Sequence, residues 1–227
     1  MTSVSEDIEQ FEACLHALHE DFQQYPFHYG NEHPIAPELY RQLLASLSQL
    51  TVPVDYRQDH SSMEEWRNRE MFNRLDEDNH EIRRVRSEVT FYDEGIWRGA
   101  KSDFDMAVFP AGQVVMMQGK KEGVGNFIDV ATPLSVLCEI KHSMNMSGQF
   151  RSGGERDIQA LASYPGEVGR RYFVFLDWWP RDGYGNRTFQ KDVRQLRERL
   201  DSLDTQVDVA YLPRTGDLQF VRGIGPD

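Results

Sequence analysis

Val-Leu-Cys-Glu-Ile-Lys, residues 136–141, and Asp-Met-Ala-Val-Phe, residues 105–109, are the two stretches that decide the fold. Both are mostly apolar, as in strands buried on both faces, yet both carry acidic side chains. Successive side chains of a strand point to opposite faces, so Glu139 and Lys141 share one face. A neighbouring strand could bring Asp105 beside them. Two carboxylates and an ammonium group among core residues are costly to bury unless something pairs them, and a divalent metal ion is the obvious candidate.

The hydrophobic periodicity around these stretches predicts an α/β protein. Helices are expected over residues 3–23, 37–50 and 155–164, from residue 61 and from residue 188; strands are expected over 82–92, 103–110, 114–118, 134–141, 172–176, 207–212 and 218–221. Ser3 and Glu6 have the spacing of a capping box at the start of the first helix. Residues 51–60 and 119–125 are expected to be loops. The strands at 82–92, 103–110 and 134–141 can form a meander, and the later strands should add in parallel through crossover helices.

The length of 227 residues suits one sizeable domain with an extension. We expect an N-terminal helical extension over residues 1–29 and a main domain over residues 30–227. No apolar run is long enough to cross a membrane, and the N-terminal residues do not form a signal peptide. The chain is therefore expected to be soluble and cytoplasmic, without a membrane partner.

The net charge of −12 argues against a protein coated in basic surface for nonspecific binding to nucleic acid. It leaves room for a local basic groove, because the basic residues are clustered. Such clusters occur at residues 83–86, 120–121, 151–156, 170–171 and 194–199. The two cysteines, Cys14 and Cys138, lie in a helical and a strand-like pattern and are interpreted as small buried hydrophobes.

The Glu139-Ile-Lys141 triplet, with Asp105 on a preceding strand, resembles the PD-(D/E)xK, or restriction-endonuclease-like, nuclease superfamily. The order of helix, three strands, helix and strand is similar to the core of that superfamily over roughly residues 30–180. Phe104 stands where the proline of the PD signature would be. The resemblance implies a restriction-endonuclease-like mixed central sheet flanked by helices.

The resemblance also implies an activity: a Mg²⁺-dependent nuclease that hydrolyses phosphodiester bonds, with Mn²⁺ as a possible substitute. Asp105, Glu139 and the carbonyl of Ile140 would bind the metal through hard oxygen ligands. Lys141 would position the attacking water or offset charge on the phosphorus. We expect DNA rather than RNA as substrate, an endonuclease of a restriction, repair or antiviral-defence system, and a homodimer or a larger complex.

Two assignments stay open at this point. Asp103 has the same face parity as Asp105 and could be the ligand instead, although the apolar run starts directly after Asp105. Superfamily members often take a further acid from the first core helix. Glu32 is the first choice for that acid, Glu38 the second and Glu88, on the first strand, the third.

The polar loop after the triplet carries further basic and amide groups. Gln149, Arg151 and Arg156 could contact the scissile phosphate, and a solvated surface loop explains them equally well. Among function classes, the alternative to a nuclease is a catalytically inactive module of the same fold that binds nucleic acid or a partner protein. The complete set of Asp105, Glu139 and Lys141 favours the enzyme.

Overall fold

The computed structural model of the chain describes residues 3–29, 34–58, 81–92, 103–112, 114–120, 124–143, 154–177 and 206–222, together with the single residues 194, 198 and 201. The helix expected from residue 61 lies outside this part. Residues 194, 198 and 201 are helical, in agreement with the helix expected from residue 188.

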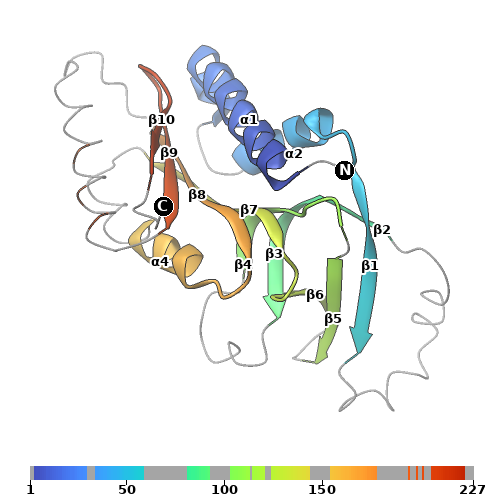
Figure 1. Ribbon diagram of the computed structural model, residues 1–227. Coiled ribbons are helices and arrows are strands. Elements are labelled where there is room, and N and C mark those ends of the chain that lie inside the picture. Colours follow the sequence, from blue (N-terminus) through green and yellow to red (C-terminus); the bar gives the residue numbers. More distant parts are fainter. Residues whose placement is uncertain are drawn as a thin grey trace.

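The architecture is mixed α/β, as the periodicity predicts (Figure 1). Within the described ranges, ten strands are hydrogen-bonded in the order β10-β9-β8-β7-β4-β3-β6-β5-β1-β2. Their bounds are β1 Thr51–Gln58, β2 Glu81–Arg83, β3 Val85–Tyr92, β4 Asp103–Val108, β5 Val114–Lys120, β6 Val124–Asp129, β7 Leu134–Ser143, β8 Val168–Asp177, β9 Val207–Pro213 and β10 Gln219–Val221.

The expected connectivity is confirmed for the strands that carry the two acid-bearing stretches. β3, β4 and β7 pair as an antiparallel meander. β8 then pairs in parallel with β7, and β9 in parallel with β8. A parallel neighbour needs a crossover, which between β7 and β8 includes the helix α4, Glu155–Ser163.

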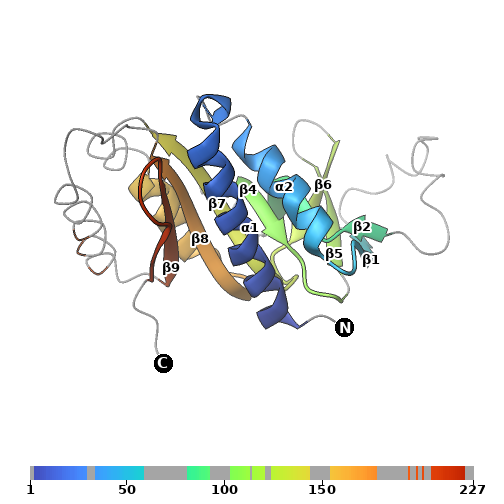
Figure 2. The ribbon, with the colours of Figure 1, turned by 90° about the horizontal axis from the view of Figure 1, so that it is seen from above.

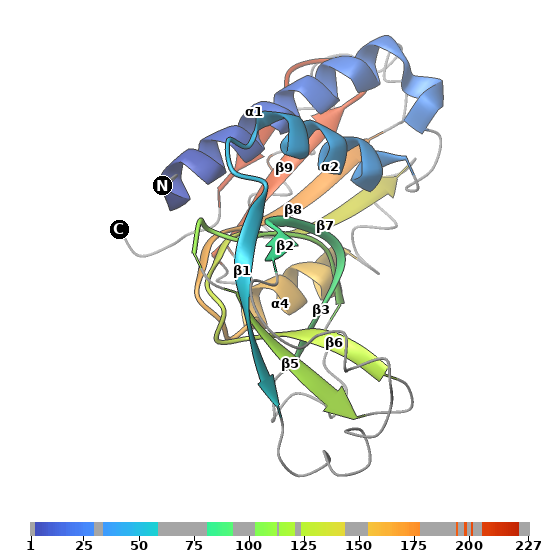
Figure 3. The same cartoon turned by 90° about the vertical axis from the view of Figure 1, so that its right-hand side faces the viewer.

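Helices cover the two faces of this sheet unequally (Figures 2 and 3). α1, Val4–Gln24, and α2, Ile35–Ser46, lie side by side on one face and share an apolar cluster with β4, β7 and β8. α1 begins with the expected capping box between Ser3 and Glu6. A 3₁₀ helix, η1 at Pro26–Tyr29, follows it. α4 packs on the opposite face, where Ile158 and Leu161 join a second cluster. The boundary expected at residue 29 stays a prediction, and α1 packs its apolar face directly on the sheet.

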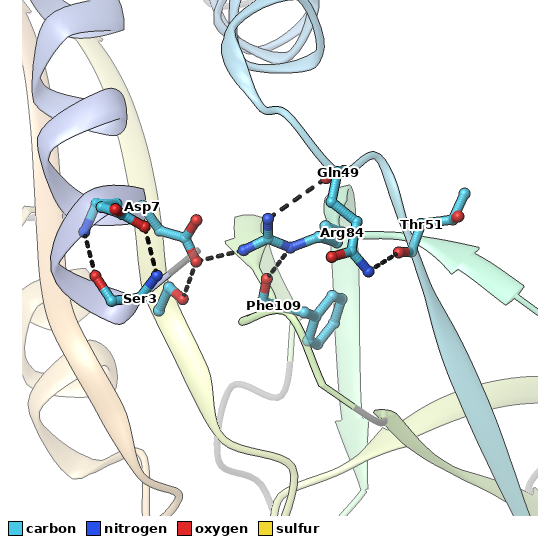
Figure 4. A network of polar contacts seen from close by, with 8 residues as sticks. Ser3, Asp7, Gln49, Thr51, Arg84 and Phe109 are labelled. Carbon is cyan, nitrogen blue, oxygen red and sulfur yellow. Dashed lines mark hydrogen bonds and ion pairs between the residues drawn. The ribbon is translucent and has the colours of Figure 1, made fainter. Parts of the chain in front are cut away.

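A buried ion pair joins α1 to the sheet at the turn between β2 and β3 (Figure 4). Arg84 and Asp7 are both fully buried and hydrogen-bonded to each other. Arg84 Nε also donates to the carbonyl oxygen of Phe109 over 2.8 Å, and Ser135 Oγ donates to Asp7 Oδ2 over 2.6 Å. These bonds offset the cost of removing two charges from water, which is large for an unpaired ion.

Strands lie where loops were expected, so the expected loop at residues 51–60 was wrong over 51–58, and the expected loop at residues 119–125 was wrong at its two ends. β1 contains Pro53, which has no N–H to donate to a ladder. Residues 51–53 pair only with β2, and residues 54–58 pair only with β5, so Pro53 lies on a stretch with a single neighbour. β6 covers the end of the glycine-rich segment, and Lys120 pairs with Val124 at the end of the β5–β6 hairpin.

Candidate functional site

The acid-bearing strands β4 and β7 pair for only three residues and then separate. Their ladder runs from Val108 opposite Val136 to Met106 opposite Cys138. The next position in this register is Asp105 opposite Glu139. Beyond this point a side chain, and not a main-chain carbonyl, is the hydrogen-bond acceptor for β7. Asp105 Oδ2 accepts a hydrogen bond of 2.7 Å from the N–H of Ile140. The carboxylate of Asp105 therefore lies between the two strands where they part.

The backbone of Ile140 faces the same gap. In an antiparallel ladder the N–H and C=O of one residue point toward the same neighbouring strand. Since the N–H of Ile140 bonds to Asp105, its carbonyl oxygen also points toward β4. The side chain of Ile140 is buried in the cluster under α1 and α2. The residue thus offers one main-chain oxygen on the side where Asp105 lies.

Glu139 is fully buried on the face that α4 covers. Leu137, two residues earlier on the same face, belongs to the cluster with Ile158 and Leu161. Burial raises the pKa of the Cys138 thiol well above its ordinary value, and the charges of Asp105 and Glu139 raise it further. Both carboxylates therefore act electrostatically on Cys138, which directly precedes Glu139 on β7, and that cysteine is held in its neutral thiol form.

Lys141 points toward α4, as its parity with Glu139 predicts. Its Nζ lies 3.5 Å from Asp157 Oδ2, and its side chain is 31% exposed against 11% for Asp157. The ammonium group thus reaches solvent while its partner carboxylate is mostly enclosed. Glu139 and Lys141 share one face of β7, and Asp105 lies beside them on β4, as the sequence predicts.

Asp157 is a residue of this site that the sequence reasoning missed. It lies in the first turn of α4, one residue before Ile158 and four before Leu161, the two buried apolar residues of that helix. An acid at these spacings belongs to the buried stripe of a helix rather than to its solvated face. That signal was present in the sequence and could have identified Asp157.

The candidates for a further acid differ in their positions. Glu32 lies outside the described residues. Glu38 is in the first turn of α2, on the other side of the sheet, and Arg41 donates two hydrogen bonds to it. The bonds from Arg41 hold the pKa of Glu38 below its usual range, despite partial burial.

Glu88 lies closest to the site by strand register. On β3 and β4, Ser87 pairs with Met106 and Val89 pairs with Phe104, so Glu88 lies at the level of Asp105. Glu88 has φ 51, the one positive φ among the non-glycine residues that the structure describes. Such a conformation is uncommon outside glycine and is often found at functional sites.

In both β3 and β4, the alternation of side chains between the two faces of the sheet is interrupted at this level. Val85 belongs to the cluster under α1 and α2, whereas Val89 belongs to the cluster under α4, although four residues should return a strand to the same face. Met106 and Phe104 are divided between the two clusters in the same way. The site is therefore built at an irregularity shared by β3 and β4.

Of the remaining candidate residues, the structure describes Asp103 and Arg156. The backbone of Asp103 pairs with Thr90 on β3, so it lies one residue pair beyond Phe104 and Val89. Arg156 is exposed on the first turn of α4. Gln149 and Arg151 lie outside the described residues.

The donor set can be compared with what a metal ion requires. Within the described ranges, no three or more His, Cys, Asp and Glu side chains are grouped so that they could hold a metal. Asp105, Glu139 and the Ile140 carbonyl are hard oxygen donors, and Mg²⁺ is commonly bound by one or two carboxylates with several waters. A carboxylate offers about four acceptor positions, so the bond from Ile140 leaves others on Asp105 for a cation. By residue type, these oxygen donors are therefore ones that Mg²⁺ uses.

Comparisons with protein-family models, curated proteins and solved structures find no match to this chain. In the part of the chain that the structure describes, no helix combines the length and apolar character needed to cross a membrane.

Proposed function

We propose that this chain is a metal-dependent nuclease with a restriction-endonuclease-like core. The observation that carries the proposal is that Asp105 lies opposite Glu139 in the strand register where β4 and β7 separate, with its carboxylate bonded to the N–H of Ile140 and with Lys141 on the same face as Glu139. The meander of β3, β4 and β7, followed by α4 and the parallel strand β8, is similar to the core order of that superfamily.

Asp105, Glu139 and the carbonyl of Ile140 would hold Mg²⁺. When bound, the ion supplies a Lewis acid that polarises a phosphoryl oxygen and lowers the pKa of a water molecule. The bond from the Ile140 N–H orients the carboxylate of Asp105 before any ligand arrives, which reduces the ordering cost of binding. Glu88, at the level of Asp105 on β3, is our choice for the further acid.

Lys141 provides the positive charge of the site. Its ammonium group donates hydrogen bonds to the attacking water or to the phosphoryl oxygens, where negative charge develops in the transition state. Because its side chain is partly exposed, its ammonium group can reach a substrate from solvent. The buried position of Glu139 excludes bulk water from one side of the site.

The substrate class follows from this chemistry. A phosphodiester brings negative charge to a chain whose own net charge is −12, so divalent metal is needed to offset repulsion as well as to react. We propose DNA as the substrate and endonucleolytic cleavage as the reaction. A second subunit or a partner protein would supply basic surface for binding DNA.

The test is a cleavage assay with supercoiled plasmid, single-stranded DNA and RNA, each with Mg²⁺, Mn²⁺ or a chelator. Plasmid nicking reports endonuclease activity, because a circle has no end. We expect metal-dependent cleavage and a loss of about 100-fold or more in Asp105→Asn, Glu139→Gln and Lys141→Met. Asp217→Asn is the matched control for the two acidic positions, since it removes a carboxylate charge from the exposed connection between β9 and β10.

Two results would contradict the proposal. Cleavage that persists equally in the wild type and in all three site variants means that the activity arises elsewhere or from a contaminant. Binding of DNA without cleavage of any substrate, in Mg²⁺ and in Mn²⁺, favours the inactive binding module instead.

A further inference from the structure

The contact between Lys141 and Asp157 joins the proposed active strand to the helix that crosses over to β8. Lys141 Nζ and Asp157 Oδ2 lie 3.5 Å apart. The helix α4 is fixed against the sheet by Ile158 and Leu161, both fully buried. Asp157 precedes Ile158 directly, so its position is set by the same packing. The carboxylate of Asp157 is therefore held in place and attracts the ammonium group of the flexible Lys141 side chain.

Lys141 has a second carboxylate within its reach. Glu139 is two residues away on the same face of β7, where neighbouring side chains stand about 7 Å apart. A lysine carries its charge on a flexible four-carbon stem. An ammonium group paired with Glu139 would occupy the side of that carboxylate on which the metal must bind. Lys141 can therefore compete with the metal unless another group holds it.

We propose that Asp157 is a positioning residue that holds the Lys141 ammonium away from Glu139 and thereby keeps Glu139 available to the divalent metal. This inference rests on the proposed function, because it assumes that Glu139 binds metal. Asp157 itself touches neither metal nor substrate. Its effect is exerted through Lys141, so removing Lys141 should remove the need for Asp157.

The test measures binding of Mn²⁺ alone, by the electron paramagnetic resonance signal of the free ion, to the full chain. We expect Asp157→Asn to weaken Mn²⁺ affinity by about 10-fold, in the range seen when groups that orient metal ligands are removed. Asp157→Glu should restore part of the affinity. The double variant Asp157→Asn/Lys141→Met should bind Mn²⁺ about as tightly as Lys141→Met alone, because the competing ammonium group is gone.

Cleavage kinetics add a readout that a loss of packing would not give. In Asp157→Asn, the Mn²⁺ concentration for half-maximal cleavage should rise, while the rate at saturating Mn²⁺ falls much less. Asp217→Asn should change neither quantity. Thermal unfolding of each variant identifies any that is not folded, and Asp157→Ser, which also removes the carboxylate, then serves in place of Asp157→Asn.

The outcomes separate the two proposals. Unchanged Mn²⁺ affinity in Asp157→Asn, or a double variant that binds as weakly as Asp157→Asn, overturns the role of Asp157 and leaves the nuclease intact. A wild-type chain that binds no Mn²⁺ overturns both.

Discussion

At the scale of single residues, the unusual backbone of Glu88 is the feature with the clearest energetic consequence. A left-handed conformation costs a residue with a Cβ roughly 1–2 kcal/mol, and glycine avoids that cost. Glycine in a strand loses about 0.5–1 kcal/mol through its greater freedom when unfolded. The two terms partly cancel at φ 51, whereas a β-branched side chain adds strain beyond that which Glu88 already bears.

We therefore expect Glu88→Gly to leave the free energy of unfolding unchanged or raise it by up to about 1.5 kcal/mol, and Glu88→Val to lower it by about 1 kcal/mol. Urea denaturation measures both. Ser87→Val is the matched control, because Ser87 is an exposed neighbour without a positive φ, where a β-branched residue should be tolerated. Equal losses in Ser87→Val and Glu88→Val would mean that the conformation of Glu88 carries no strain.

The same residue links stability to the proposed activity. If Glu88 is the further acid, Glu88→Gly should remain at least as stable as the wild type and still lose metal-dependent cleavage. A glycine variant that is folded and fully active would remove Glu88 from the site and return Glu32, which precedes α2, to first place among the candidates.

At the scale of elements, the sequence predicts those whose residues follow one period without interruption. α1 begins at a capping box and β7 is a mostly apolar run, so both appear close to their expected bounds. β8 begins four residues before the expected start at residue 172, because Gly169, Arg170 and Arg171 interrupt its apolar pattern. β1 could not be predicted with the same rules, because Pro53 normally excludes a ladder and its tolerance depends on which neighbour pairs with which residue. The pairing of each part of β1 is decided by tertiary structure, which local sequence rules do not describe.

The buried pair of Arg84 and Asp7 gives a prediction about how α1 is held on the sheet. Removing one partner leaves the other charge buried and uncompensated, which costs about 3–5 kcal/mol. Arg84→Met and Asp7→Leu should each lower the free energy of unfolding by about that amount. The double variant should lose much less than the sum, since no charge is then left alone. Guanidinium denaturation measures all three.

An exposed ion pair provides the comparison for this network. Arg41 pairs with Glu38 on the surface of α2 and is 69% exposed, so Arg41→Met should cost less than about 1 kcal/mol. If Arg84→Met is no more damaging than Arg41→Met, the buried network does not hold α1 in place.

At the scale of the whole molecule, topology was more predictable than the site. The meander and the two parallel additions follow from the order of strands and helices, since few connections satisfy both pairing and handedness. The positions of Glu88 and Asp105 depend instead on the irregularity that β3 and β4 share at this level. Strict alternation along each strand predicts no such irregularity. That Glu88 lies opposite Asp105 is therefore known only from the register of β3 and β4.

The first helix and the last strands are joined by a buried histidine. His19, on α1, lies with its Nε2 2.8 Å from the carbonyl oxygen of Pro213 at the end of β9. Burial lowers the pKa of His19, and the carbonyl of Pro213 opposes that shift in part. A lowered pKa means that the folded chain accepts a proton at this position less readily than the unfolded chain does.

Stability should therefore fall as the pH decreases below about 6.5, the ordinary pKa of histidine, because the unfolded state then binds the additional proton. The contribution of His19 is fully present above that pH and is lost as the pH falls toward its lowered folded value. The slope from this one residue is at most about 1.4 kcal/mol per pH unit. Urea denaturation at pH 7.5 and pH 5.5 measures the difference. His19→Gln, whose amide can still donate to Pro213, should reduce it, and His28→Gln, at an exposed position on η1, should not. If His19→Gln retains the full pH dependence, other groups cause it, and the junction between α1 and β9 is insensitive to protonation.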